Sequence, residues 1–205
     1  MSVLTESTDP TALVEAPAVE PCAAEFGTRR GRLQHHIFSL ALRCGAFRRE
    51  RRIDWSRVQQ FIFVCRGNIC RSPYAARRAR VAGLRAFSCG LHIGDNVAID
   101  PMAAMIARSR GLDLHQHVPR DIQQIRVNTG DLLVAMEPAH LQPLRKIIRN
   151  AGAQATLLGL WSTPRRPCLT DPYGLCEAYF NRCFMLIDSG IAGLAAAYTE
   201  ARRVA

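Results

Sequence analysis

The chain has 205 residues, of which 48% are hydrophobic, and its 27 basic side chains outnumber 17 acidic ones to give a formal charge of +10. This composition supports a buried core and excludes a chain that is disordered throughout. No apolar run reaches the roughly 18 to 20 residues of a membrane-spanning helix. The charge favours an anionic partner but does not distinguish nucleic acid, anionic lipid or phosphorylated protein.

The first 57 residues differ in composition from the rest, and we predict that they form an N-terminal extension. Residues 1–25 contain five acidic residues, three prolines and no basic residue. They show no helical or strand period, so we expect them to be disordered. They also lack the cationic start of a secretory signal, and the eight cysteines include no C-x-x-C pair. We therefore expect reduced thiols and a cytoplasmic protein.

Residues 26–57 reverse the charge, with nine arginines against two acidic residues. The apolar stretch 35–47 is expected to form a short helix, followed by four of these arginines. Three interpretations are open. The helix packs on the main domain, residues 35–52 contact a membrane surface as a basic amphipathic element, or the segment is not a true part of the protein.

From residue 58 to 205, short apolar runs alternate with helical patterns, and we predict that this part is the main domain. Strands are expected at 58–65, 85–90, 131–137 and 155–160, and helices at 73–82, 100–110, 138–150 and 176–197. This alternation predicts an α/β, three-layer, flavodoxin-like doubly wound fold, with a four-stranded parallel sheet and helices on both faces. Ligands bind such sheets beyond the carboxyl ends of the strands, here just after Val64.

The loop after the first predicted strand reads Cys65-Arg66-Gly67-Asn68-Ile69-Cys70-Arg71-Ser72-Pro73. Its Gly-Asn pair suits a tight reversal with positive φ, and its Ser-Pro pair is favoured as the N-cap and first residue of a helix. Backbone N–H groups and the helix dipole would then hold a tetrahedral dianion, to which Arg71 adds two charge-assisted hydrogen bonds. The same dipoles would lower the pKa of the Cys65 thiol. The sequence therefore predicts a nucleophile beneath a bound phosphate.

This loop resembles the C-x-G-N-x-C-R-S-P signature of the low-molecular-weight protein tyrosine phosphatases. The resemblance extends over roughly residues 58–197 and includes Ser88-Cys89-Gly90, the Gly111 to His117 element, Arg120 and Asp171-Pro172-Tyr173. It implies a bacterial exopolysaccharide- or capsule-associated phosphatase that acts on a tyrosine autokinase and needs no metal or cofactor. The catalytic cysteine of this family usually lies within the first two dozen residues, so the extension is a departure from it.

The resemblance also implies roles for the catalytic residues. Cys65 would attack phosphorus to form a cysteinyl-phosphate, while Arg71 holds the equatorial oxygens. Asp171 would protonate the departing phenolate and then activate the water that releases phosphate. Tyr173 would form a wall against the substrate ring.

In the same way, the resemblance implies that the loop binds phosphate. The phosphate-binding set would be Arg66, Gly67, Asn68, Ile69, Cys70, Arg71 and Ser72. Within it, Ser72 would hydrogen-bond the sulfur and Asn68 would hold the loop in shape. Cys70 either packs in the core or protects Cys65 through a reversible disulfide, and both alternatives stay open.

Other functions compete with this interpretation. An arsenate reductase of the same fold needs two further cysteines after the third strand, where residues 134–141 contain none. The arginine-phosphate branch of the family tends to have threonine where Ile69 stands. A phosphate-binding module without turnover would not need intact Cys65, Arg71 and Asp171, and no nucleic-acid motif is present. His115 and His117 have no third ligand nearby, so we expect a surface loop rather than a metal site.

Overall fold

The computed structural model describes residues 25–94 and 97–204, so the disorder predicted for residues 1–25 lies, except for Glu25, outside the described residues. In chain order its elements are α1 (Arg29–Arg43), α2 (Arg48–Arg51), η1 (Trp55–Arg57), β1 (Gln60–Cys65), α3 (Arg71–Val81), β2 (Ala86–Gly90), α4 (Pro101–Ser109), η2 (Ile122–Gln124), β3 (Asp131–Ala135), α5 (Pro138–Ala151), β4 (Gln154–Leu157), η3 (Leu158–Leu160) and α6 (Glu177–Val204).

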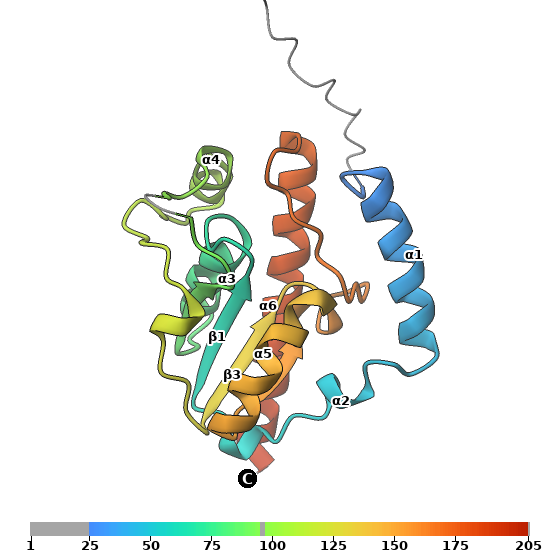
Figure 1. Cartoon of the computed structure of the whole chain (residues 1–205), viewed down its shortest axis with the longest axis vertical. Helices are drawn as coiled ribbons and strands as arrows, with labels where there is room; N and C mark the ends of the chain where they lie inside the picture. Colours follow the sequence, from blue (N-terminus) through green and yellow to red (C-terminus); the bar gives the residue numbers. More distant parts are fainter. Residues whose placement is uncertain (1–24, 95–96, 205) are drawn as a thin grey trace, which may run out of the picture.

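The four strands form one parallel sheet in the order β2-β1-β3-β4 (Figure 1). In its register Val64 of β1 lies between Cys89 of β2 and Ala135 of β3. The chain leaves β1 toward β2 on one side and later returns to β3 on the other. This reversal of strand order opens a crevice at the carboxyl ends of β1 and β3. The predicted doubly wound α/β fold is therefore confirmed.

Alternate side chains of the strands enter two separate cores, because successive residues of a strand point to opposite faces of the sheet. Phe61 and Phe63 pack with residues of α3, α4 and α6. Ile62 and Val64 pack with residues of α5 and of the extension. Both faces of the sheet are covered, which explains why the strands are continuous apolar runs.

Residues 29–57 of the extension pack on the domain. Phe47 is 9% exposed in the core beneath α5, where the α1 residues Phe38 and Leu42 join it. The segment after α1 then runs beside β4, and Thr156 Oγ1 donates a 2.6 Å hydrogen bond to the Glu50 carbonyl. The segment therefore packs on the main domain, as the first of the three interpretations stated. The boundary between residues 57 and 58 stays a prediction.

The expectations about membrane-spanning helices and about reduced cysteines can both be compared with the described residues. No helix among them has the length and apolar character needed to span a membrane. Cys176, immediately before α6, is disulfide-bonded, whereas we expected reduced thiols. The cysteines recorded as free thiols are Cys44, Cys65, Cys70, Cys89, Cys168 and Cys183.

Candidate active site

The cysteine-arginine loop lies at the carboxyl end of β1 and leads directly into α3. Cys65 is the last residue of β1, and Arg71 is the first residue of α3. The helix thus begins earlier than predicted, with Cys70 rather than Ser72 at the N-cap and no side-chain hydrogen bond to the cap. The predicted N-cap was wrong because the Ser72 hydroxyl is engaged inside the loop.

The Cys65 sulfur is buried and surrounded by hydrogen-bonding groups. Its side chain is 3% exposed, its Sγ lies 2.9 Å from Ser72 Oγ, and the Asn68 backbone N–H donates to it at 3.3 Å. Ser72 Oγ accepts a hydrogen bond from Asn68 Nδ2, which leaves its own hydrogen for Cys65 Sγ or for the more distant Cys89 carbonyl at 3.3 Å. Donors around sulfur stabilise a thiolate.

Asn68 connects the loop to two other segments, β2 and the connection that contains His117 and Arg120. Its φ of 55° lies in the left-handed region, which Asn tolerates better than most residues, and its side chain is fully buried. Its Nδ2 donates to Ser72 Oγ and Ser88 Oγ, both at 2.9 Å. Its Oδ1 accepts from the Arg120 backbone N–H at 3.0 Å and lies 3.1 Å from His117 Nε2. These contacts fix the shape of the loop.

His117 belongs to this network, although the sequence suggested an ordinary surface loop. Its Nε2 faces both the carbonyl and the side-chain oxygen of Asn68, each at 3.1 Å, so Nε2 must carry the hydrogen. Burial lowers the pKa of His117, the hydrogen bond to the Asn68 carbonyl opposes this shift, and the charges of Arg80 and Arg120 reinforce it. Burial therefore favours the neutral form of this imidazole.

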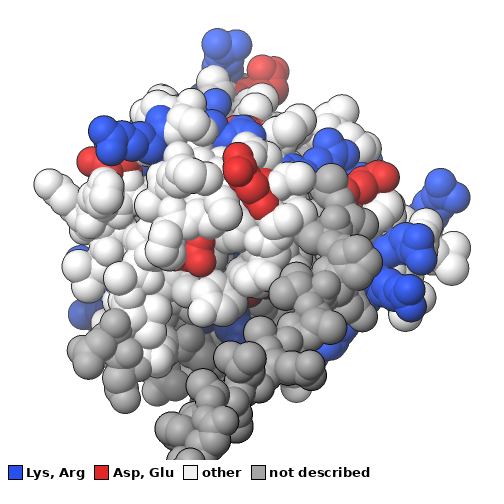
Figure 2. Space-filling model, turned by 90° about the horizontal axis from the view of Figure 1, so that it is seen from above, with Lys and Arg blue, Asp and Glu red and all other residues white. Residues whose placement is uncertain are grey.

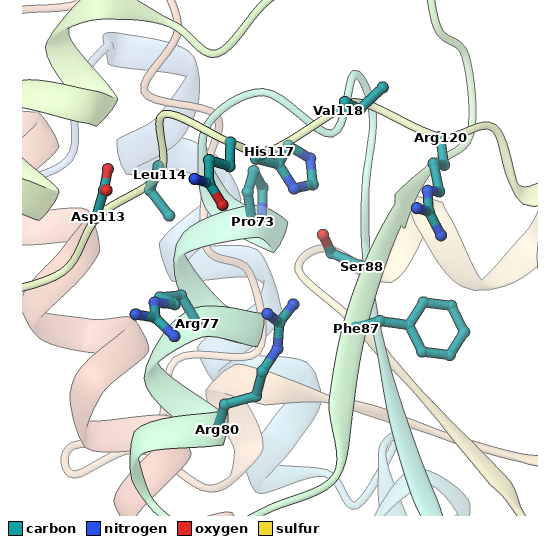
Figure 3. Close-up of a pocket in the computed structure, with 11 residues that line it drawn as sticks. Pro73, Arg77, Arg80, Phe87, Ser88, Asp113, Leu114, His117, Val118 and Arg120 are labelled. Atoms are coloured by element: carbon teal, nitrogen blue, oxygen red, sulfur yellow. The ribbon is translucent and has the colours of Figure 1, made fainter.

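A basic cavity of about 380 Å³ adjoins this network (Figure 3). His117 and Ser88 line it together with Arg77 and Arg80 of α3, and Arg120 lies on its other side. Two arginines of α3 therefore lie beside the residues that shape the candidate phosphate-binding loop.

Arg71 is almost fully buried, with 1% of its surface exposed, and it is held by acceptors from two other loops. Its NH2 lies 2.7 Å from Asp171 Oδ2, and its NH1 donates to the Leu169 carbonyl at 2.7 Å and to Glu137 Oε1. Burial disfavours the charged form, but Asp171 and Glu137 outweigh burial and raise the pKa of Arg71. Within the described part of the chain the buried Nε has no acceptor, so it can donate to a ligand.

Sequence reasoning did not identify Glu137, the N-cap residue of α5, which lies two residues after the end of β3. Its signal was its place close after a buried strand, at the edge where Cys65 also lies. His140 lies beside it, with Nε2 at 3.6 Å from Glu137 Oε1. Burial, reinforced by the charge of Arg71, lowers the pKa of His140 to about 3, so this imidazole is neutral.

The other predicted residues occupy different positions around the loop. Cys70 is buried at 2% exposure, and burial raises the pKa of its thiol. Tyr173 is 63% exposed, and its backbone N–H contacts Asp171 Oδ1 at 3.4 Å. Arg66 is exposed, while Gly67 and Ile69 are half-buried. Within residues 25–94 and 97–204, no group of three or more His, Cys, Asp or Glu side chains could hold a metal ion.

A larger cavity, of about 610 Å³, opens beside Asp171, and we refer to it as the cleft. Arg66, Glu137 and His140 line it from the domain, and four residues line it from the extension, namely Thr28, Arg30, Gly31 and Gln34. The view from above shows acidic and basic side chains interspersed on this end of the molecule (Figure 2). No sequence pattern indicated that the extension reaches this point.

Comparison with known proteins identifies the family. Residues 60–204 match the model of the low molecular weight phosphotyrosine protein phosphatases. A low molecular weight protein-tyrosine-phosphatase of Streptomyces coelicolor is 33% identical over 154 residues, which cover 67% of this chain and 92% of that protein. The low molecular weight protein-tyrosine-phosphatase Etp of Escherichia coli is 28% identical over 134 residues, 64% of this chain and 89% of that protein.

A solved structure of another protein has the same fold as this chain. Vibrio vulnificus Wzb in complex with benzylphosphonate superimposes with a TM-score of 0.58 at 24% identity and covers 68% of this chain and 99% of that one. The similarity leaves the extension outside the matched region, because the family model begins at residue 60.

Proposed function

This chain belongs to the low-molecular-weight phosphotyrosine protein phosphatase family, and we propose that it hydrolyses phosphotyrosine in proteins through a cysteinyl-phosphate intermediate. The observation that carries the proposal is the arrangement of Cys65, Arg71 and Asp171 around one loop. The loop carries the Cys65 sulfur and the buried Arg71 guanidinium, and the Asp171 carboxylate joins Arg71 from a distant part of the chain.

In the first step the Cys65 thiolate attacks phosphorus. The S–P bond forms as the bond from phosphorus to the tyrosyl oxygen breaks, and Asp171 gives its proton to that oxygen. Backbone N–H groups of the loop and Arg71 stabilise the charge on the transferred group, because phosphoryl transfer depends mainly on positioning and electrostatics. No metal or cofactor is required, since the thiolate itself is the nucleophile.

In the second step a water molecule attacks phosphorus and passes its proton to Asp171. The S–P bond breaks, inorganic phosphate leaves, and Cys65 returns to the thiolate, which Ser72 and the Asn68 N–H stabilise. Asp171 is then protonated again and ready for the next substrate. One carboxyl group thus serves as acid and then as base.

For the substrate, we propose a tyrosine autokinase of polysaccharide export, in keeping with the resemblance to the exopolysaccharide-associated type, and we place the enzyme in the cytoplasm. Tyr173 would form a wall for the substrate ring, and residues 66–72 would bind the phosphate. Ile69 favours phosphotyrosine over phosphoarginine.

The test is hydrolysis of p-nitrophenyl phosphate and of a phosphotyrosine peptide by the wild type, Cys65→Ser and Asp171→Ala. We expect turnover by the wild type, none by Cys65→Ser, and trapping of ³²P on the wild-type cysteine after acid quenching. Turnover by Cys65→Ser would exclude the covalent mechanism. A wild type that is inert on aryl phosphates but reduces arsenate with thioredoxin, or that hydrolyses only phosphoarginine, would establish a rival function instead.

A further inference from the structure

The N-terminal extension reaches the cleft, although similarity to the family begins only at residue 60. In Figure 1 helix α1 stands beside the long α6, with its first turn at the same end of the molecule as the start of α6. Thr28, Arg30, Gly31 and Gln34 line the cleft opposite Arg66 and Asp171. The candidate active site therefore has a wall that the matched part of the family does not provide.

Residues 25–27, at the start of this wall, contact the segment that carries Asp171. Arg166, which is 8% exposed, contacts Glu25 Oε1 through its NH2 at 3.0 Å, and its guanidinium lies 5.3 Å from the centre of the Phe26 ring. Gly27 has a φ of +74°, and a Cβ at this position would lie 2.7 Å from Leu175. The positive φ favours glycine at this position, and the close contact with Leu175 shows that the wall and the segment that carries Asp171 are packed together.

The first turn of α1 is well defined beside the cleft. The Thr28 side chain caps the helix by accepting a 2.9 Å hydrogen bond from the Gly31 N–H. This cap fixes the start of the helix and hence the position of Arg30 in its first turn. Arg30 is exposed, as is Arg66 across the cleft.

The charges of the cleft do not cancel. Its carboxylates Glu137 and Asp171 are both paired with the buried Arg71. Among residues 25–94 and 97–204, by contrast, neither Arg30 nor Arg66 makes an ion pair within 4.0 Å of a carboxylate. Arg30, Arg66 and Arg71 together exceed these two carboxylates by one positive charge, and Arg30 and Arg66 line the cleft, which favours an anionic group of the substrate beyond the phosphate.

We propose that residues 25–34 form one wall of the substrate cleft, and that Arg30 and Arg66 bind an acidic side chain close to the phosphorylated tyrosine of the protein substrate. The proposal rests on the phosphatase activity proposed above and adds a substrate class, acidic phosphotyrosine segments. The extension then acts as a specificity element of this chain.

The experiment compares two phosphotyrosine peptides that differ only in having Glu or Gln at the positions flanking the phosphotyrosine. The quantity measured is the ratio of kcat/KM for the Glu peptide to that for the Gln peptide, at low and at high salt. The full-length wild type should prefer the Glu peptide at low salt, and this preference should shrink as salt screens the charges. Arg30→Glu should lower the ratio by about 3- to 10-fold, the range for a reversed charge at an exposed subsite.

Arg32→Glu is the matched control, because Arg32 is exposed on the same helix but does not line the cleft. Arg32→Glu changes the net charge by the same amount as Arg30→Glu. Because Arg32 lies outside the cleft, this variant should leave both the peptide ratio and p-nitrophenyl phosphate hydrolysis unchanged. Acidic residues in the first turn favour helices, so neither variant should unfold α1. An unchanged ratio in Arg30→Glu, or an equal loss in Arg32→Glu, would overturn the subsite.

The outcomes also separate the two proposals. A wild type that hydrolyses neither peptide refutes the phosphatase function itself. A wild type that hydrolyses both peptides equally well retains that function and refutes only the acidic subsite.

Discussion

Asp171 Oδ2 lies 2.7 Å from NH2 of Arg71, so the proposed general acid and the proposed phosphate ligand form an ion pair. A phosphate dianion that binds Arg71 would compete with Asp171 for this group and add negative charge beside the carboxylate. The ion pair holds the Asp171 carboxyl beside the group that would bind the phosphate, within reach of the bond that breaks.

This arrangement predicts the behaviour of Asp171→Asn, which keeps the size of the side chain but cannot donate a carboxyl proton. We expect kcat for phenyl phosphate to fall by about 10²- to 10⁴-fold, the usual contribution of a general acid. The loss should be smaller for p-nitrophenyl phosphate, whose leaving group needs less protonation. A series of aryl phosphates measures this dependence, and an equal loss across the series would contradict the acid role.

Glu137 is expected to act by positioning Arg71 rather than by touching the substrate. Glu137→Gln keeps a hydrogen-bond acceptor but removes the charge, so the guanidinium should shift, and kcat/KM for p-nitrophenyl phosphate should fall by about 10- to 100-fold. Glu137→Asp should recover part of this loss because it restores the carboxylate. Equal activities of both variants and the wild type would show that Leu169 and Asp171 suffice to hold Arg71.

For Asn68, two substitutions separate backbone conformation from hydrogen bonding. Asn68→Gly tolerates the φ of 55° but removes the side-chain contacts, whereas Asn68→Ala removes the contacts and also strains the backbone. Both variants should lose activity, and Asn68→Ala should be less stable than Asn68→Gly by about 1 kcal/mol in urea unfolding. Full activity of Asn68→Gly would mean that the side-chain network does not shape the loop.

Much of this architecture could be predicted from local sequence signals. The strands were identifiable because both faces of the sheet are covered, so runs such as residues 61–64 are apolar throughout. Cys65 and Arg71 are close in sequence, on a loop with turn and helix-start signals of its own. Asp171 became a candidate only through the resemblance, because 100 residues separate it from Arg71 in the chain.

The residues that were missed depend on packing between distant segments. Glu137 and His117 reach the loop from connections whose paths local patterns do not determine. The Ser72 N-cap was wrong because a tertiary contact with Cys65 takes up the hydroxyl that an isolated helix would use. Arg30 could not be identified, since its place beside the cleft depends on contacts of Arg166 and Leu175 with residues 25–27.

The packing of the extension predicts a stability difference between Phe47 and Leu40. Phe47 is 9% exposed in the core beneath α5, so Phe47→Ala should lower the free energy of unfolding by about 3 kcal/mol. Leu40 of α1 is 63% exposed, and Leu40→Ala should change it by no more than about 0.5 kcal/mol. Urea unfolding of the full chain measures both, and equal effects would mean that residues 38–47 do not contribute to the core.

His140 predicts a loss of stability in acid. Its pKa is lowered to about 3 in the folded protein, mainly by burial, against about 6.5 when unfolded. At pH values between these two pKa values, His140 binds a proton in the unfolded chain but not in the folded protein. The contribution of His140 to the free energy of unfolding is therefore fully present above pH 6.5. It decreases as the pH falls, by at most about 1.4 kcal/mol per pH unit.

The comparison that isolates this residue is His140→Gln, which cannot be protonated. Between pH 7 and pH 5 the wild type should lose about 2 kcal/mol more unfolding free energy than the variant, the amount expected from a single histidine with this shift. The exposed His115 provides the control, since His115→Gln should retain the wild-type dependence on pH. If the His140→Gln and wild-type curves have the same slope, the acid sensitivity arises elsewhere and the imidazole of His140 is not held neutral.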